Sequence, residues 1–257
     1  MDKSFALTRI GFMTRLSLLI AVLWSCLACP ALAQDAVPQE ILLRTLFVKV
    51  GDHTGTAFKI DYMGKIYLVT ARHVAAGLPE RDAVIQVRRG QNWEDLHTIR
   101  TLLPPSNAAD IAVLETHEIA AQPFQIAVMD DTDGFTMGQQ IWFLGFPFGG
   151  LGTLGPNGEL IPFMKRGTMS AVDPTNHDAV VLYIDGFNNP GFSGGPILFW
   201  SFSKHKYEIA GVVQGYREDT AKVLVNGIQV DTNILVNSGI LIAYSIKHAV
   251  QAINNIQ

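Results

Sequence analysis

Short apolar segments rich in β-branched residues, separated by Gly, Pro, Asn and Asp, dominate the chain from residue 34 onward. This pattern is typical of antiparallel strands joined by tight turns, and it predicts an all-β fold. Eleven strands are predicted, at residues 41–50, 56–60, 66–70, 83–88, 111–115, 140–146, 167–172, 180–184, 197–200, 209–214 and 240–243. So many short strands indicate barrels or a sandwich.

Helical patterns are found in only two places. A short helical turn is predicted at residues 71–76, and a terminal helix at residues 245–255, where Ile246, Val250 and Ile253 recur at helical spacing. A polar link at residues 121–123 divides the strands into two halves, residues 34–122 and 123–243, followed by a C-terminal segment at 244–257. We expect a cleft between the halves, where binding sites tend to lie.

The N-terminus has the layout of a secretory signal peptide. Three basic residues precede an apolar run at residues 16–28, and a Pro and the small-residue triplet A-L-A at 31–33 follow. The apolar run is shorter than the about 20 residues that span a bilayer, which favours cleavage after Ala33 over retention as an anchor. We therefore expect export to the periplasm or the medium, without membrane association after cleavage.

Composition and charge narrow the possible chemistry. Both cysteines, Cys26 and Cys29, lie in the predicted signal peptide, so we expect neither a disulfide nor a cysteine-based metal site in the mature chain. Removing residues 1–33 changes the net charge from −4 to −6, which disfavours nucleic acid as a partner. The histidines at positions 53, 97, 117, 177 and 205 lack metal-ligand spacing, and no metal or cofactor is predicted.

Three segments carry candidate catalytic residues. A predicted strand leads into T-A-R-H at residues 70–73, which ends in His73, and D-I-A-V-L at residues 110–114 begins with Asp110. The third segment, G-F-S-G-G-P at residues 191–196, places Ser193 in a glycine-rich bend whose amides can point toward a developing oxyanion. Alone, the first two segments fit a structural His and a turn Asp. Serine needs a base, and that base an acceptor, so the three residues together predict a nucleophilic site between the halves.

These segments resemble the His, Asp and Ser boxes of chymotrypsin-like serine endopeptidases. The bacterial Deg/HtrA type is the most similar, through L-G-F-P-F-G at residues 144–149, R-G-T-M-S-A at 166–171 and L-I-A-Y at 241–244. The resemblance implies two six-stranded antiparallel β-barrels, a C-terminal helix and a protein or peptide substrate. No peptide-binding PDZ domain of the kind that Deg enzymes usually carry is expected after residue 243.

The resemblance also implies a role for each site residue. His73 would act as general base and then acid, Asp110 would orient it, and Ser193 would be the nucleophile. The backbone amides of Gly191 and Ser193 would form the oxyanion hole. Phe187 and Gln214 would line the specificity pocket, and the absence of an acid at Phe187 disfavours cleavage after Lys or Arg.

One departure concerns Phe192, where digestive members of the family carry an Asp that pairs with a newly cut N-terminus. Without that carboxylate, the loop that forms the oxyanion hole must be preformed or ordered in another way. Two alternatives follow from the residues. A serine esterase is one, because residues 191–195 also match the G-x-S-x-G elbow, although a strand rather than a helix is predicted after the serine. A protease-fold binding protein, with Phe192 holding the oxyanion loop closed, is the other.

Overall fold

The computed structural model describes residues 36–119, 124, 126–129, 134, 136–156, 158–173, 175 and 178–255. From Pro38 onward the chain forms one compact unit. The predicted signal peptide and the predicted link at residues 121–123 lie outside the described residues. Within the described part, no helix is both long and apolar enough to cross a bilayer.

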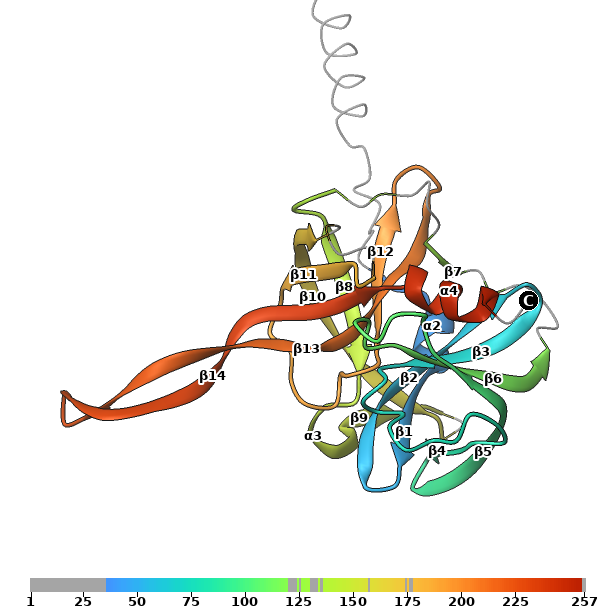
Figure 1. Cartoon of the computed structure of the whole chain (residues 1–257), viewed down its shortest axis with the longest axis horizontal. Coiled ribbons are helices and arrows are strands. Elements are labelled where there is room, and N and C mark those ends of the chain that lie inside the picture. Colours follow the sequence, from blue (N-terminus) through green and yellow to red (C-terminus); the bar gives the residue numbers. More distant parts are fainter. Residues whose placement is uncertain are drawn as a thin grey trace, which may run out of the picture. The chain divides into compact units, whose positions relative to one another are not determined.

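The first half of this unit is a closed antiparallel barrel (Figure 1). Its strands follow the order β1-β2-β3-β6-β5-β4, and β1 pairs with β4 to close the ring. The strands are β1 (Thr45–Val50), β2 (His53–Tyr62), β3 (Lys65–Thr70), β4 (Val84–Arg89), β5 (Asn92–Leu102) and β6 (Ala112–Ile119). Alternate residues of these strands, among them Val48, Ala57, Leu68, Ile85 and Leu114, form its apolar core.

The second half is also built around a ring of six strands. The pairings run β11-β14-β13-β12-β8-β10, and β10 pairs with β11 to complete the ring. These strands are β8 (Gln140–Gly145), β10 (Leu160–Asp173), β11 (Val181–Asp185), β12 (Pro196–Ser201), β13 (Lys206–Val225) and β14 (Ile228–Ser245), while β7 (Ala127–Val128) and β9 (Gly152–Leu154) pair with β13 and β10. The prediction of an all-β, chymotrypsin-like double barrel is confirmed.

Helices are short and few among the described residues. The predicted terminal helix is confirmed as α4 (Lys247–Asn254), whose apolar face contacts β6 of the first barrel. The predicted strand at residues 41–50 is wrong at its start, because α2 (Gln39–Arg44) precedes β1. Glu40 and Arg44 form an ion pair across one turn of α2, which favours the helix there.

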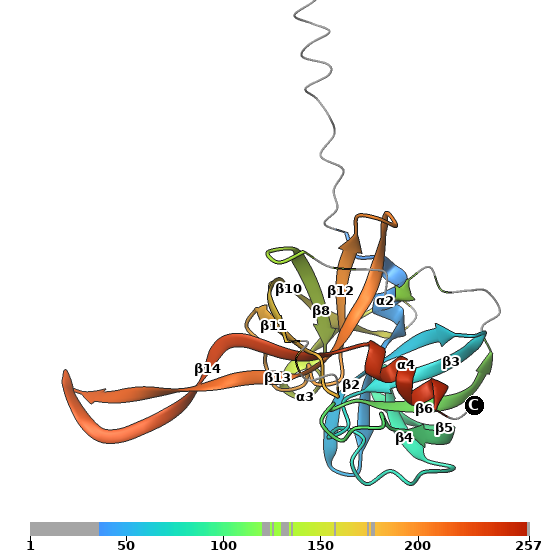
Figure 2. The same cartoon turned by 45° about the horizontal axis from the view of Figure 1, so that its top comes forward.

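The largest departure from prediction is a long two-stranded ribbon. Strands β13 and β14 continue far beyond the barrel as far as a turn at Asn226 and Gly227, whereas the sequence predicted strands only at 209–214 and 240–243. The ribbon extends away from the barrels in both views (Figures 1 and 2). Asn226 and Gly227 have φ of 52° and 79°, the conformation that a two-residue hairpin turn requires.

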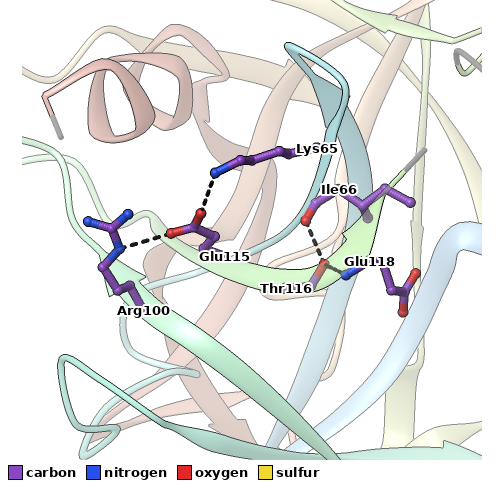
Figure 3. A network of polar contacts seen from close by, with 6 residues as sticks. All are labelled: Lys65, Ile66, Arg100, Glu115, Thr116 and Glu118. Atoms are coloured by element: carbon purple, nitrogen blue, oxygen red, sulfur yellow. Dashed lines mark hydrogen bonds and ion pairs between the residues drawn. The ribbon is translucent and has the colours of Figure 1, made fainter. Parts of the chain in front are cut away.

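A buried carboxylate ties three strands of the first barrel together (Figure 3). Glu115 of β6 is 3% exposed and accepts hydrogen bonds from Lys65 of β3 at 2.8 Å and from Arg100 of β5 at 2.9 Å. Burial alone would raise the pKa of Glu115, but the bonds and charges of Lys65 and Arg100 outweigh it, and the pKa lies below its usual value. Glu115 therefore stays ionised at neutral pH.

Candidate active site

The structure brings His73 and Asp110 together beside the open end of the first barrel. His73 lies on turns that follow β3, and Asp110 lies just before β6. Because β3 and β6 are paired antiparallel neighbours, the end of one strand meets the start of the other. Asp110 Oδ1 accepts the His73 backbone N–H at 3.0 Å, and Oδ2 lies 2.6 Å from His73 Nδ1.

This contact fixes the orientation of the imidazole ring. With Asp110 ionised, Nδ1 donates to its carboxylate, and the opposite nitrogen, Nε2, is left to accept a proton. The His73 side chain is 49% exposed and that of Asp110 is 21% exposed. Burial and the nearby charge of Asp110 raise the pKa of Tyr244, so this phenol remains neutral beside the pair.

Ser193 lies on the loop between β11 and β12, in the second barrel. Its hydroxyl donates a 2.9 Å hydrogen bond to the backbone carbonyl of Gln214. Among the described residues, no hydrogen bond joins Ser193 to His73. The resting hydroxyl is therefore held by the β13 backbone, and catalytic contacts of this kind often form only when substrate binds.

Residues 189–192 form a tight turn that orients the candidate oxyanion amides. Phe192 N donates to Asn189 O at 3.3 Å. Gly191, the third residue of this turn, has a φ of 103°, a backbone conformation that favours glycine. Pro190 O accepts from Phe148 N at 3.2 Å. Because N–H and C=O of one peptide point in opposite directions, the Gly191 N–H faces away from Phe148. Within the described part of the chain, Gly191 N and Ser193 N donate to no acceptor.

Close backbone packing explains the glycines around Ser193. A Cβ at Gly191 would lie 2.2 Å from Phe146 O, and one at Gly194 would lie 2.0 Å from Thr56 O. These distances are far below van der Waals contact, so no other residue fits without moving the backbone. The loop is thus pressed against both barrels.

Thr56 of β2 joins the first barrel to residues 186–195, the loop that carries the candidate nucleophile Ser193 and that we call the nucleophile loop. Its N–H donates to Ser193 O at 2.8 Å, and its hydroxyl donates to Gly191 O at 2.7 Å. The same hydroxyl accepts from Phe146 N at 3.1 Å, and Thr56 O accepts from Thr70 Oγ1 at 2.7 Å. Thr56 is fully buried. Thr56 was not predicted as a site residue, although it directly follows Gly55 at the start of the predicted strand 56–60.

Contacts of Phe192 hold the loop around Ser193 in place, although this position lacks the aspartate of digestive proteases. Its ring is fully buried and packs edge-on against Phe143, with centroids 5.2 Å apart. The ammonium of Lys165 lies 5.4 Å from the same ring and donates to Phe187 O at 2.8 Å and to Asn189 Oδ1. Burial of an aromatic ring and one lysine thus anchor the loop. Burial also lowers the pKa of Lys165.

The two predicted pocket residues lie in different surroundings. Gln214 contacts Ser193 through its backbone carbonyl. Phe187 is 57% exposed, and its neighbour Asn188 is 2% exposed. Asn188 Oδ1 has no hydrogen-bond partner, while its backbone carbonyl accepts from Asn237 Nδ2 at 2.6 Å. Asn188 and Asn237 were not predicted, and no local pattern marks them, because their contact depends on the ribbon.

A pocket of about 370 Å³ lies against the candidate pair. His73 and Asp110 line it together with Arg72, Leu78 and Leu103. Across the residues that the structure describes, no three His, Cys, Asp or Glu side chains are grouped to hold a metal ion.

Comparisons with solved structures show the same fold. The active form of the protease Rv3671c from M. tuberculosis matches with a TM-score of 0.55 at 16% identity, over 88% of this chain and 86% of that one. A serine endoprotease from Yersinia pestis matches with a TM-score of 0.52 at 19% identity, over 86% and 68%. The HtrA-type protease AlgW matches with a TM-score of 0.52 at 19% identity, over 85% and 61%.

Sequence comparisons give the family. A search of curated proteins finds no match for this chain. The profile of the trypsin-like peptidase domain, in contrast, matches residues 54–199. That range includes Thr56, His73, Asp110 and Ser193, and it covers more than half of the chain. The chain therefore belongs to the trypsin-like peptidase domain family.

Proposed function

We propose that this chain is an exported serine endopeptidase that hydrolyses peptide bonds through His73, Asp110 and Ser193 and an acyl-enzyme intermediate. The observation that carries the proposal is the 2.6 Å contact between His73 Nδ1 and Asp110 Oδ2, which leaves Nε2 available as a base. Family membership supports peptide or protein substrates. No nucleic-acid partner and no cofactor form part of the proposal.

The reaction begins with a rotation of the Ser193 side chain. Its hydroxyl leaves Gln214 O and turns to His73 Nε2, which takes the proton as Oγ attacks the scissile carbonyl carbon. The oxyanion accepts hydrogen bonds from Gly191 N and Ser193 N. His73 then donates the proton to the leaving amine as the C–N bond breaks. Water then attacks the acyl carbon while His73 takes its proton, and His73 passes that proton to Ser193 Oγ as the ester C–O bond breaks, which releases the new carboxyl group.

Two observations favour this function over the alternatives. An esterase nucleophile elbow leads from the serine into a helix, whereas here β12 (Pro196–Ser201) follows almost at once. A binding protein whose oxyanion loop is held closed by Phe192 would have the loop amides paired within the protein. Among the described residues, Gly191 N and Ser193 N instead donate to no acceptor.

Export is proposed from the sequence, with the signal peptide cut after Ala33 and the product in the periplasm or the medium. The test is expression of the full chain in an exporting bacterial host, fractionation and mass spectrometry of the intact product. A product that begins at Gln34 in the periplasm or medium supports the proposal. A product that keeps residues 1–33 in the membrane fraction contradicts it.

Activity is tested with a fluorophosphonate probe, which reacts only with an activated serine. We expect the purified protein to be labelled, and Ser193→Ala and His73→Ala variants to remain unlabelled. Cleavage of a peptide library, with p-nitrophenyl esters as the comparison, then separates peptidase from esterase and shows whether Lys and Arg are disfavoured before the scissile bond. A folded, unlabelled wild-type protein would contradict the proposed function.

A further inference from the structure

The side chain of Lys165 reaches from β10 to the loop that carries Ser193. Its ammonium donates to the backbone carbonyl of Phe187 at 2.8 Å and to Asn189 Oδ1. The same nitrogen lies 5.7 Å from the centre of the Phe187 ring and 5.4 Å from the centre of the Phe192 ring. Both hydrogen bonds and both ring contacts are therefore made with the nucleophile loop.

These contacts involve both ends of the turn that orients the candidate oxyanion amides. The hydrogen bond from Phe192 N to Asn189 O closes this turn, and its first and last residues both contact the Lys165 ammonium. The N–H of Gly191 lies inside the turn, and the N–H of Ser193 follows it directly. One ammonium thus holds the two ends of the segment whose amides would stabilise an oxyanion.

The sheet of the second barrel fixes where this ammonium lies. Lys165 of β10 is paired with Phe143 of β8, and directly opposite residues of an antiparallel pair project from the same face. Phe143 is also the ring on which Phe192 packs edge-on. The lysine and the buried ring of the loop are therefore placed by the same two strands.

No acidic group competes with the loop for this ammonium. Across the residues that the structure describes, Lys165 forms no ion pair, and burial lowers its pKa without a carboxylate to raise it again. The neighbouring Arg166 lies opposite Trp142, with its guanidinium carbon 5.8 Å from that ring, on the other face of the strand. Asp185 of β11 is paired with Thr168, three residues further along β10.

The positive charge of Lys165 therefore strengthens contacts with the loop alone. Hydrogen bonds from a charged donor are stronger than those between neutral groups, and a cation is attracted to the face of an aromatic ring. A neutral side chain of the same length would lose both effects.

We propose that Lys165 is the positioning residue that keeps the oxyanion amides preformed, in place of the N-terminal ion pair of digestive proteases. Because its charge comes from within the chain, the loop needs neither a newly cut N-terminus nor an activating partner to adopt this shape. Lys165 touches no reacting atom. The inference rests on the proposed function, since the amides matter to the rate only if Ser193 is acylated.

Two adjacent residues of β10 give a matched pair of variants, Lys165→Met and Arg166→Met. Each removes one positive charge and leaves an unbranched apolar side chain. On a peptide substrate we expect Lys165→Met to lower kcat about 10- to 100-fold with KM within about twofold of wild type, because the oxyanion donors lose their support. Arg166→Met should leave both constants within about twofold of wild type. Equal kinetic effects of the two variants on an active enzyme overturn the inference.

Hydrogen exchange read by mass spectrometry reports on the loop itself, whether or not the protein is active. Three amides of the loop are hydrogen-bonded, namely Phe192 N, Gly194 N to Val213 O at 2.8 Å, and Gly195 N to Phe192 O at 2.9 Å. We expect peptides that cover residues 186–195 to exchange at least about tenfold faster in Lys165→Met and at the wild-type rate in Arg166→Met. Unchanged exchange in Lys165→Met overturns the inference. Faster exchange in Lys165→Met of a protein whose wild type is inactive supports the positioning role and contradicts the proposed function alone.

Chemical rescue separates the charge of Lys165 from its packing. Both cysteines of the chain precede residue 34, so Lys165→Cys adds a single thiol after the predicted cleavage site. With 2-bromoethylamine, the thiolate sulfur displaces bromide and gains an arm whose ammonium lies as many bonds from the backbone as Nζ does. Iodoacetamide adds a neutral arm of the same length by displacing iodide.

We expect the aminoethylated protein to recover kcat to within about threefold of wild type, and the iodoacetamide product to stay at least about tenfold below it. Circular dichroism verifies that both products are folded. No recovery after aminoethylation, or equal recovery after the two treatments, overturns the role of the charge.

Discussion

Thr56 Oγ1 donates a 2.7 Å hydrogen bond to the carbonyl of Gly191, 135 residues further along the chain. Thr56 belongs to the first barrel and Gly191 to the nucleophile loop of the second. The Thr56 hydroxyl also accepts a hydrogen bond from Phe146 N, so this one side chain contacts both the segment after β8 and the loop around Gly191. Thr56 is thus a positioning residue for the candidate oxyanion amides, although it touches no reacting atom.

Replacing Thr56 with Val keeps the side-chain shape but removes the hydroxyl, leaving Gly191 O and Phe146 N without this partner. We expect kcat to fall about 10- to 100-fold with little change in KM, because the oxyanion donors lose their support. Thr56→Ser should restore most of the rate. Steady-state kinetics on a peptide substrate measures both constants.

The matched control for this prediction is Thr98→Val. Thr98 is buried and donates to Ala83 O at 3.0 Å, far along the chain from the nucleophile loop. Its loss should lower the free energy of unfolding by about 1 kcal/mol and leave kcat unchanged. Equal effects of the two variants on kcat would show that Thr56 acts only through stability.

Replacing Asp110 with Asn tests the orientation of His73. The amide would favour the wrong imidazole tautomer, with the proton on Nε2, so that His73 could no longer accept from Ser193. We expect a folded protein whose kcat falls by about 10⁴-fold at neutral pH. Peptidase assays together with thermal unfolding decide the matter, and near-normal turnover would mean that Asp110 has no such role.

Replacing Glu115 with Gln tests the buried ion network of the first barrel. Lys65 and Arg100 lose their charged partner, and we expect the free energy of unfolding to fall by about 1–3 kcal/mol, with fluorophosphonate labelling unchanged. The control is Glu118→Gln. Glu118 is 41% exposed and pairs with Lys59 at the surface, so its loss should cost less than about 1 kcal/mol. Urea unfolding at pH 7 measures both.

Because His248 is buried, we expect the free energy of unfolding to fall in mildly acidic solution. It is 2% exposed, accepts from Val180 N through Nε2 and contacts Gln251 through Nδ1. Burial lowers the pKa of His248, so the unfolded chain binds this proton more readily than the native one. The contribution is complete above the unfolded pKa, about 6.5, and is lost as the pH falls from there toward the native pKa.

Urea unfolding between about pH 7.5 and pH 5 tests this contribution, since the carboxylates titrate mostly at lower pH. The free energy of unfolding should decline with pH in the wild type and decline less in His248→Gln, which keeps an acceptor for Val180 N. Identical slopes in the two proteins would show that another group carries the effect.

Much of the fold could be predicted because its signals are local. Alternating β-branched segments mark the barrel strands, and the spacing of Ile246, Val250 and Ile253 marks α4. The ribbon could not be predicted in this way, because R-E-D-T-A-K at residues 217–222 is polar and becomes a strand only through its pairing with residues 233–237. The Asn-Gly turn at residues 226–227 was the one local signal for it.

The candidate site also contains residues that could be predicted from the sequence and residues that could not. His73, Asp110 and Ser193 stand in recognisable segments, and their residue types follow from the chemistry of serine nucleophiles. Thr56 and Lys165 do not, because their roles arise from contacts with Gly191, Asn189 and Phe192 that only the folded chain creates. Helix α2 was missed because its apolar residues Ile41 and Leu42 continue the pattern of the following strand.

The contact between Thr56 and the nucleophile loop also limits how such a protein can be rebuilt from parts. Backbone atoms of Ser193 and Thr56 meet at 2.8 Å, and Gly194 leaves no room for a side chain against Thr56. A chimera that took its first barrel from one relative and its second from another would have to carry residues 54–57 and 191–195 from the same parent. Recombination between the barrels therefore disturbs the site even when every catalytic side chain is retained.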